Sequence, residues 1–411
     1  MVNDKDLLSF DYKKDFPLLA ANDVAYLDNS ATTQKPACVI EAERDFYLKH
    51  NANPLRGLYD LAMQATDIYE DGRVAVQKFI NAKSEQEIIF TRNTTESLNL
   101  VAYSYGLANL KPGDEIVTTI MEHHSNMLPW RMVAQQTGAV VKYIECAVDG
   151  SISDEAIDAA VTEKTKIVAM AEVSNVLGRL NPIAKAISAA HKVGAVAVID
   201  AAQSAPHMAI DVQKMDADFL AFSGHKMLGP MGIGVLYGKK ALLEAMPPFL
   251  SGGEMISFVS RNGQEYAPLP HKFEAGTVNA AGAAGLHAAI EYINSIGFEV
   301  IEAREAALTK LAFDAMQNIP GVHIIGGKTA EEHKGILTFT VEGVHPHDIA
   351  AILDADGVNI RAGNHCAQPL LDHLCTGATA RASLAFYNSA ADVERFINSL
   401  STIRERMGYG R

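Results

Sequence analysis

The sequence predicts an α/β protein with a large, doubly wound, mostly parallel sheet and a smaller C-terminal α/β domain. From about residue 85, short β-branched apolar runs alternate with helical stretches, as in parallel sheets built from β-α-β units. These runs lack polar alternation, which is typical of strands buried on both faces. After about residue 300 the alternation starts again, which indicates the second domain.

The expected strands of the large domain are each followed by polar residues. In chain order the strands are 87–90, 115–120, 166–170, 195–199 and 219–222, with helical segments such as 182–192 between them. The polar residues after them are Thr94 and Thr95, His123, Asn175, Asp200 with Gln203, and Ser223 with His225 and Lys226. Ligands of open α/β sheets bind beyond the carboxyl ends of the strands, so these residues predict one site.

Three parts of the chain are expected from this pattern. Residues 1–21 form an N-terminal segment that packs on the small domain, residues 22–295 form the large cofactor-binding domain, and residues 296–411 form the small domain. The small domain is expected to contain a helix over 302–317, strands over 335–341 and 357–361, a helix over 348–356 between them, and a terminal helix over 391–406.

Composition excludes several classes of function. The 411 residues contain 35 Lys+Arg and 49 Asp+Glu, a net charge of −14, without the basic patch of nucleic-acid or membrane-surface binders. Apolar stretches of about five residues are too short for a membrane span, which needs about 20. The N-terminus lacks the apolar core of a signal peptide, and the four cysteines form no CxxC pair. A cytoplasmic protein without a structural metal is expected.

Lys226 and Asp200 carry the chemical argument. A lysine at a buried strand end is costly unless its charge is neutralised or used, and a Schiff base with an aldehyde cofactor does both. Asp200 also ends an apolar strand, where a protonated pyridine nitrogen is a natural partner. Together the two residues predict pyridoxal 5′-phosphate (PLP) as the cofactor.

The neighbouring polar residues fit the rest of such a cofactor. Thr94 and Thr95 at a helix start offer hydroxyl and N–H groups to a phosphate, with Ser223 and His225 as further donors. Gln203 can donate to the ring oxygen, and His123 can stack on the ring. Each residue alone also fits a surface turn or a helix cap. The glycines of 229–238 do not match a dinucleotide-binding loop.

Six ordered motifs resemble the SUF-type (group II) cysteine desulfurases, in the class V branch of fold-type I PLP enzymes. They are SGHK (223–226), DAAQ (200–203), MEHHSN (121–126), VSNVLG (173–178), FEAGT (273–277) and RAGNHC (361–366). The resemblance extends from about Phe16 to the C-terminal helix. It implies a homodimer that converts L-cysteine to L-alanine and supplies sulfur for iron-sulfur cluster assembly.

The resemblance also implies a role for each matching residue. Lys226 would carry PLP and move protons, Asp200 would pair with the pyridine nitrogen, Gln203 with the ring hydroxyl, and His123 would stack. The phosphate would be bound by Thr95, Ser223 and His225, with Thr94 beside them and Thr277 from the second subunit. Asn175 at the cofactor, Arg381 and the nearby Arg361 would hold the substrate carboxylate.

Cys366 distinguishes a desulfurase from other class V enzymes. A free cysteine is most often a small core residue, but Cys366 lies in a loop near Arg361, and cationic neighbours favour the reactive thiolate. The resemblance makes Cys366 the nucleophile that carries the persulfide on a loop of the small domain. It also implies a small sulfur acceptor of the SUF system, which could be a zinc-containing scaffold contacted by His347.

Four positions depart from the family pattern: Leu55, Glu172, Asn364 and Met231. They leave open the preference for cysteine, selenocysteine or cysteine sulfinate. A class V lyase or aminotransferase, or a selenocysteine lyase, without a persulfide relay is therefore the alternative. A more remote alternative is a metal-binding scaffold that uses His123/His124, His345/His347 and His365/Cys366.

Overall fold

A seven-stranded sheet forms the centre of the large domain in the computed structural model, which describes residues 4–409. In spatial order its strands are β2 (Ile88–Thr91), β8 (Gly234–Gly238), β7 (Phe219–Ser223), β6 (Val196–Asp200), β5 (Thr165–Ala171), β3 (Glu115–Thr119) and β4 (Val140–Ile144). The strands from β7 to β4 are parallel, and β8 is antiparallel to both of its neighbours. The prediction of a large, mostly parallel sheet is confirmed.

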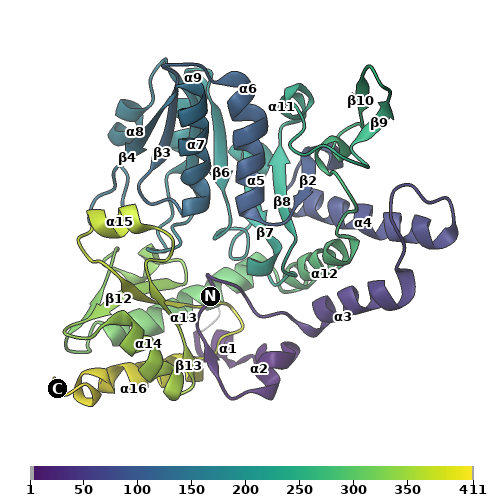
Figure 1. Cartoon of the computed structure of the whole chain (residues 1–411). Coiled ribbons are helices and arrows are strands. Elements are labelled where there is room, and N and C mark those ends of the chain that lie inside the picture. Colours follow the sequence, from purple (N-terminus) through teal and green to yellow (C-terminus); the bar gives the residue numbers. More distant parts are fainter. Residues whose placement is uncertain (1–3, 410–411) are drawn as a thin grey trace.

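Helices cover both faces of this sheet because successive strand residues point to opposite sides. In β5, Val168 and Met170 join one apolar cluster, while Ile167 and Ala169 join another. The first cluster includes residues of α4 (Asp60–Phe79), α9 (Ile183–Lys192) and α12 (Ala280–Ile296). The second includes residues of α5 (Thr94–Leu100) and α7 (Leu128–Thr137). Figure 1 shows these layers, with α3 (Ala37–Asp45) beside α12.

Two strands of the sheet were not predicted. β4 lies at the edge of the sheet and is only partly buried, so it lacks the continuous apolar run of a buried strand. β8 begins in the glycine-rich stretch 229–238. The backbones approach closely here, since a Cβ at Gly234 would lie 2.5 Å from the Cα of Asn93, the residue before Thr94. Gly234 thus lets the start of α5 pack directly on the sheet.

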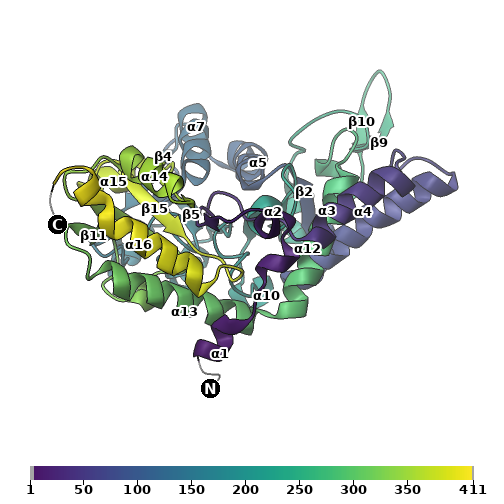
Figure 2. The same cartoon turned by 90° about the horizontal axis from the view of Figure 1, so that it is seen from below.

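The small domain is built on an antiparallel sheet in the order β11 (Val322–Ile324), β12 (Ile336–Val341), β15 (Thr379–Ser383) and β14 (Arg361–Gly363). Its helices are α13 (Phe298–Met316), α14 (Pro346–Ala355), α15 (Gln368–His373) and α16 (Ala390–Arg406). Figure 2 shows α13 and α16 side by side. The single strand expected over 357–361 is interrupted, and forms β13 (Val358–Asn359) and β14.

The N-terminal segment lies on the small domain. The guanidinium of Arg304 donates to the carbonyl of Leu7, and Lys13 forms an ion pair with Asp392. Strand β1 (Ala25–Tyr26) pairs in parallel with β13. Residues 25–26 therefore belong to the sheet structure of the C-terminal part, although the pattern assigned them to the range 22–295. Within residues 4–409, no helix combines the length and apolar character needed to cross a membrane.

Candidate active site

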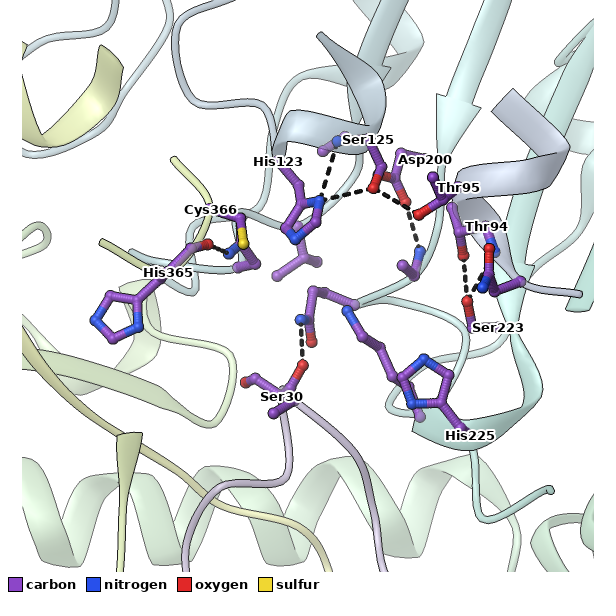
Figure 3. Close-up of a pocket in the computed structure, with 18 of the residues that line it drawn as sticks. Ser30, Thr94, Thr95, His123, Ser125, Asp200, Ser223, His225, His365 and Cys366 are labelled. Carbon is purple, nitrogen blue, oxygen red and sulfur yellow. Dashed lines mark hydrogen bonds between the residues drawn. The ribbon is translucent and has the colours of Figure 1, made fainter. Parts of the chain in front are cut away.

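One cavity collects the polar residues that follow the strands of the large domain. It lies between the ends of β5, β6 and β7 and the small-domain loop after β14. Twelve of the expected site residues line it: Thr94, Thr95, His123, Asn175, Asp200, Gln203, Ser223, His225, Lys226, Arg361, Cys366 and Arg381. Thr277 does not join them and lines a separate surface depression. Figure 3 shows part of this cavity.

Lys226 and Asp200 end neighbouring segments that line the cavity. Asp200 is the last residue of β6 and is 5% exposed, and Lys226 ends the short turn Gly224–Lys226 after β7. Burial lowers the pKa of Lys226 to about 8, although Asp200 opposes that shift. Burial raises the pKa of Asp200, against a 2.9 Å hydrogen bond from the N–H of Ala202. Burial thus disfavours the charged form of both side chains. A cationic partner would stabilise Asp200, and a covalent bond would remove the charge of Lys226.

Hydroxyl groups gather at the start of α5. Ser223 Oγ accepts a 2.8 Å hydrogen bond from the N–H of Thr94 and lies 2.7 Å from its hydroxyl. Thr95 Oγ1 lies 2.7 Å from the hydroxyl of Ser125, a residue that the sequence analysis did not select. Burial and the positive charge of Lys226 lower the pKa of His225 to about 4, so this ring is neutral near pH 7.

The buried amide of Gln203 leaves one atom without a partner. Its Nε2 donates a 2.9 Å hydrogen bond to the carbonyl of Ser30, and its Oε1 has no hydrogen-bond partner among the residues that the structure describes. An unpaired buried carbonyl is costly, which indicates that a donor on a ligand completes it. Gln203 was expected to donate to a ring oxygen. In the structure one N–H of Nε2 is bound to the carbonyl of Ser30, and the atom left without a partner is the acceptor Oε1.

His123 is held in one tautomer. The N–H of Ser125 donates to Nδ1 at 3.1 Å, so the proton of the neutral ring lies on Nε2. Burial and nearby cations, of which Lys226 is the strongest, lower the pKa of His123 to about 3. Figure 3 shows the ring between Cys366 and the Asp200 side of the cavity. His123 therefore offers a flat, uncharged ring and one N–H.

Cys366 follows β14 in an unusual backbone conformation. Its φ is +56° and that of His365 is +50°, two consecutive residues in the left-handed region. Asn175 Nδ2 donates to the carbonyl of His365, and the N–H of His124 donates to the carbonyl of Cys366, both at 2.8 Å. Large-domain groups thus hold the small-domain loop, and the thiol is half-buried at the cavity.

Arg381 in β15 is a buried cation that faces the same cavity. It is 2% exposed, and burial lowers its pKa to about 10. Its Nη1 donates to the carbonyl of Asn175 at 2.7 Å, and its Nη2 lies 3.4 Å from Asp28. Its Nε has no hydrogen-bond partner within residues 4–409. Arg361 is much more exposed, and its Nη1 lies 4.0 Å from the other carboxylate oxygen of Asp28. Asp28 was not among the residues expected at this site.

The metal-scaffold alternative finds no support in this arrangement. Across residues 4–409, no three His, Cys, Asp or Glu side chains are grouped so that they could hold a metal ion. His345 and His347 lie together at the start of α14, with ring centroids 5.0 Å apart, but outside the cavity lining.

Comparison with known proteins identifies the family. The family model for class-V aminotransferases matches residues 25–396. The chain belongs to this family. A probable cysteine desulfurase of Halalkalibacterium halodurans is 50% identical, covering 97% of this chain and 98% of that protein. A probable cysteine desulfurase of Streptomyces coelicolor is 47% identical, covering 96% and 97%.

Solved structures of the family have the same fold. A cysteine desulfurase from Escherichia coli is 40% identical with a TM-score of 0.90, over 99% of both chains. The apo cysteine desulfurase from Thermococcus onnurineus is 42% identical with a TM-score of 0.92, over 96% of this chain and 97% of that one. The predicted resemblance to cysteine desulfurases and the predicted fold class are therefore confirmed.

Proposed function

We propose that this class-V family member is a PLP-dependent cysteine desulfurase that releases L-alanine from L-cysteine and keeps the sulfur on Cys366 as a persulfide. One observation carries the proposal: the cavity brings Cys366 together with Lys226 and Asp200, from segments far apart in the chain. Lys226 and Asp200 fit many PLP enzymes. A thiol at the same cavity adds a group that can receive sulfur. The names of the relatives support this activity.

The residues of the cavity fit PLP. Lys226 would hold it covalently, Asp200 would pair with its pyridine nitrogen, and Gln203 Oε1 would accept from its ring hydroxyl. The phosphate would lie among Thr94 and Thr95 at the start of α5, Ser223 at the end of β7 and His225 after it, and Ser125 in the turn that follows β3. When bound, PLP withdraws electrons from the α-carbon of an amino acid and thereby weakens its bonds.

Arg381 is the proposed binding group for the substrate carboxylate. Its guanidinium is fixed by the carbonyl of Asn175, while its Nε remains available. A buried arginine with a free N–H edge suits a carboxylate, because the hydrogen bonds are charge-assisted. Asn175 fixes Arg381 with its carbonyl and the Cys366 loop with its side chain.

In the sulfur-transfer step, the thiolate of Cys366 attacks the sulfur of the bound cysteine. A sulfur–sulfur bond forms, the bond between sulfur and Cβ breaks, and Cβ gains a proton to give alanine. The proton that Cβ gains balances one that the two thiols release. His123 is neutral and keeps its proton on Nε2 beside Cys366, so it is the proposed hydrogen-bond donor to the reacting sulfur. Lys226 is the proposed group that removes and returns the proton at Cα. The two thiol sulfurs thus become one persulfide, and no external oxidant or reductant is required.

A homodimer would complete the site with Thr277. In a single chain Thr277 lines another depression, so its proposed phosphate contact needs a second copy. Exposed apolar side chains at Tyr47, Leu48, Leu58 and Tyr59 support such self-association.

Three further proposals come from the sequence. The chain consists of a large cofactor-binding part and a small part that carries the Cys366 loop. The protein is located in the cytoplasm, and it delivers sulfur for iron-sulfur cluster assembly.

The proposed acceptor is a small protein of the SUF system that contains zinc. His347 lies in the first turn of α14, on the domain that carries Cys366, and its side chain is exposed. A histidine there could replace a thiolate on the zinc of the partner. The freed thiolate could then receive the sulfur, because thiolates attack persulfides efficiently.

The direct test is incubation of the PLP-loaded protein with L-cysteine. We expect equal amounts of alanine and of a persulfide on the peptide that contains Cys366, measured by amino-acid analysis and mass spectrometry after alkylation. Alanine and free sulfide without persulfide would instead identify a lyase. Parallel reactions with selenocysteine and cysteine sulfinate determine whether the departures at Leu55, Glu172, Asn364 and Met231 change the substrate.

A further inference from the structure

Four donors converge on one backbone oxygen beside Lys226. The carbonyl of His225 accepts from Lys35 Nζ at 2.8 Å, from Thr32 Oγ1 at 2.9 Å, and from the N–H and hydroxyl of Thr33 at 3.1 and 3.2 Å. All of them come from the N-terminal segment 32–35, about 190 residues away in the chain. The carbonyl of the residue before Lys226 is therefore held by a group of donors that includes a cation.

Lys35 occupies an unusual position for a lysine. The hydrogen bonds of its ammonium go to uncharged oxygens of Thr32, Thr33 and His225. Burial lowers the pKa of Lys35 to about 7, and Glu43 only partly opposes this shift. Lys35 is partly buried, and a partly buried ammonium without a close carboxylate is costly. This cost indicates that Lys35 has a role that an ordinary solvated surface lysine does not have.

The segment restrains the Lys226 turn on both sides. The peptide unit is planar, so holding the His225 carbonyl also orients the N–H and Cα of Lys226. On the other side, Thr33 Oγ1 accepts a 2.9 Å hydrogen bond from the N–H of Leu228, whose φ is +65°. The same loop also binds Gln203 through the carbonyl of Ser30. Thus one loop contacts two of the groups that would hold PLP.

We propose that Lys35 is a positioning residue which, with Thr32 and Thr33, fixes the turn that carries Lys226 and thereby sets the affinity for PLP. The inference rests on the proposed use of PLP at Lys226, and it does not depend on the sulfur chemistry. Lys35 itself does not line the cavity and does not touch the reacting atoms.

The test compares Lys35→Met and Lys35→Arg with a matched control, Lys272→Met. Lys272 is a buried lysine that likewise donates to two carbonyls, those of Leu243 and Glu244, but it lies outside the cavity lining. For each full-length protein, we would measure the dissociation constant for PLP, the absorption maximum of the bound cofactor, and the melting temperature without cofactor.

Lys35→Met should weaken PLP binding at least about tenfold, the change expected on loss of one charge-assisted hydrogen bond, and should shift the absorption maximum. Lys35→Arg should recover part of the affinity. Lys272→Met should lower the melting temperature but leave the PLP affinity and spectrum unchanged. If Lys35→Met does not fold, Thr32→Val removes one donor and should weaken PLP binding in the same direction.

Wild-type PLP affinity and spectrum in the Lys35 variant, or an equal loss in Lys272→Met, would overturn the proposal. Unchanged affinity in Thr32→Val would overturn it if that variant replaces Lys35→Met. The PLP titrations are done without added L-cysteine. A wild-type protein that binds PLP but forms no persulfide would therefore refute the desulfurase function alone, whereas the role of Lys35 would be decided by the PLP titrations.

Discussion

The backbone N–H of His124 donates a 2.8 Å hydrogen bond to the carbonyl of Cys366. This bond joins the small-domain loop that carries the thiol to the large-domain loop that carries His123. Together with Asn175, which binds the carbonyl of the preceding His365, it keeps Cys366 at the cavity in a left-handed conformation. The position of the proposed nucleophile is thus fixed by one backbone N–H and one side-chain amide of the other domain.

Cys366→Ser should keep the PLP spectrum but form no persulfide from cysteine. The cofactor contacts lie elsewhere in the cavity, and a serine hydroxyl is a far weaker nucleophile than a thiolate. Mass spectrometry after cysteine treatment checks this result. Cys375→Ser is the control, because Cys375 is exposed and does not line the cavity. Unchanged alanine production by Cys366→Ser with a reductant present would favour a lyase.

Arg381→Ala should raise KM for cysteine by about 10- to 150-fold, which corresponds to about 1.5–3 kcal/mol for a lost charge-assisted hydrogen bond. Arg381 is buried at the cavity, whereas Arg361 is 45% exposed and its charge is more strongly solvated. Arg361→Ala should therefore have a smaller effect. Steady-state kinetics on both variants decides the assignment, and a larger effect at Arg361 would move the carboxylate site there.

Uptake of PLP by the cofactor-free protein should depend on pH through Lys226. Burial lowers the pKa of this amine from 10.5 to about 8, and only the neutral amine attacks an aldehyde. The rate should rise about tenfold per pH unit below pH 8 and then level off. Stopped-flow absorbance over pH 6 to 10 checks this expectation. A rate that keeps rising to pH 10 would show an ordinary lysine.

Glu274→Gln should destabilise the fold by about 3–5 kcal/mol, because it removes the buried charge partner of Arg73 and leaves only the partly exposed Glu70. The two side chains are 2% and 0% exposed and lie 2.7 Å apart. Urea unfolding measures the change. In Glu244→Gln, which affects an exposed pair with Lys240, the change should stay within about 0.5 kcal/mol. A similar small loss in Glu274→Gln would contradict the importance of the buried pair.

The same pair predicts a pH dependence of stability. Burial would raise the pKa of Glu274, but Arg73 outweighs it and lowers the pKa from 4.5 to about 2. The folded state therefore binds fewer protons than the unfolded state between these values. The contribution of Glu274 is complete above about pH 4.5 and falls as the pH decreases toward 2. The stability difference between wild type and Glu274→Gln should shrink over that range.

His347→Ala should remove the stimulation of turnover by a zinc-containing acceptor protein. The basal rate and PLP binding should remain, because His347 lies outside the cavity lining. Alanine formation with and without the acceptor measures the effect, and His323→Ala on the exposed part of β11 is the control. Full stimulation of His347→Ala would refute the ligand-exchange proposal but not the desulfurase activity.

The sequence pattern predicted the residues of the cavity that follow buried strands. Asp200, Ser223 and Lys226 could be found in this way, because apolar runs mark central strands and parallel strands end at one edge. Asp28, Ser30, Lys35 and Ser125 could not. Their importance comes from contacts such as that of Asp28 with Arg381, which are 353 residues apart and leave no local pattern.

Local sequence therefore determines the type of sheet and the identity of most groups around the cavity, since periodicity and strand ends are properties of neighbouring residues. The tertiary structure decides how these groups are oriented. It shows that Gln203 presents its oxygen, that His123 carries its proton on Nε2, and that the carbonyl before Lys226 is held by Lys35. These features depend on hydrogen bonds between specific atoms, many of them between distant segments, and folding alone brings such segments together.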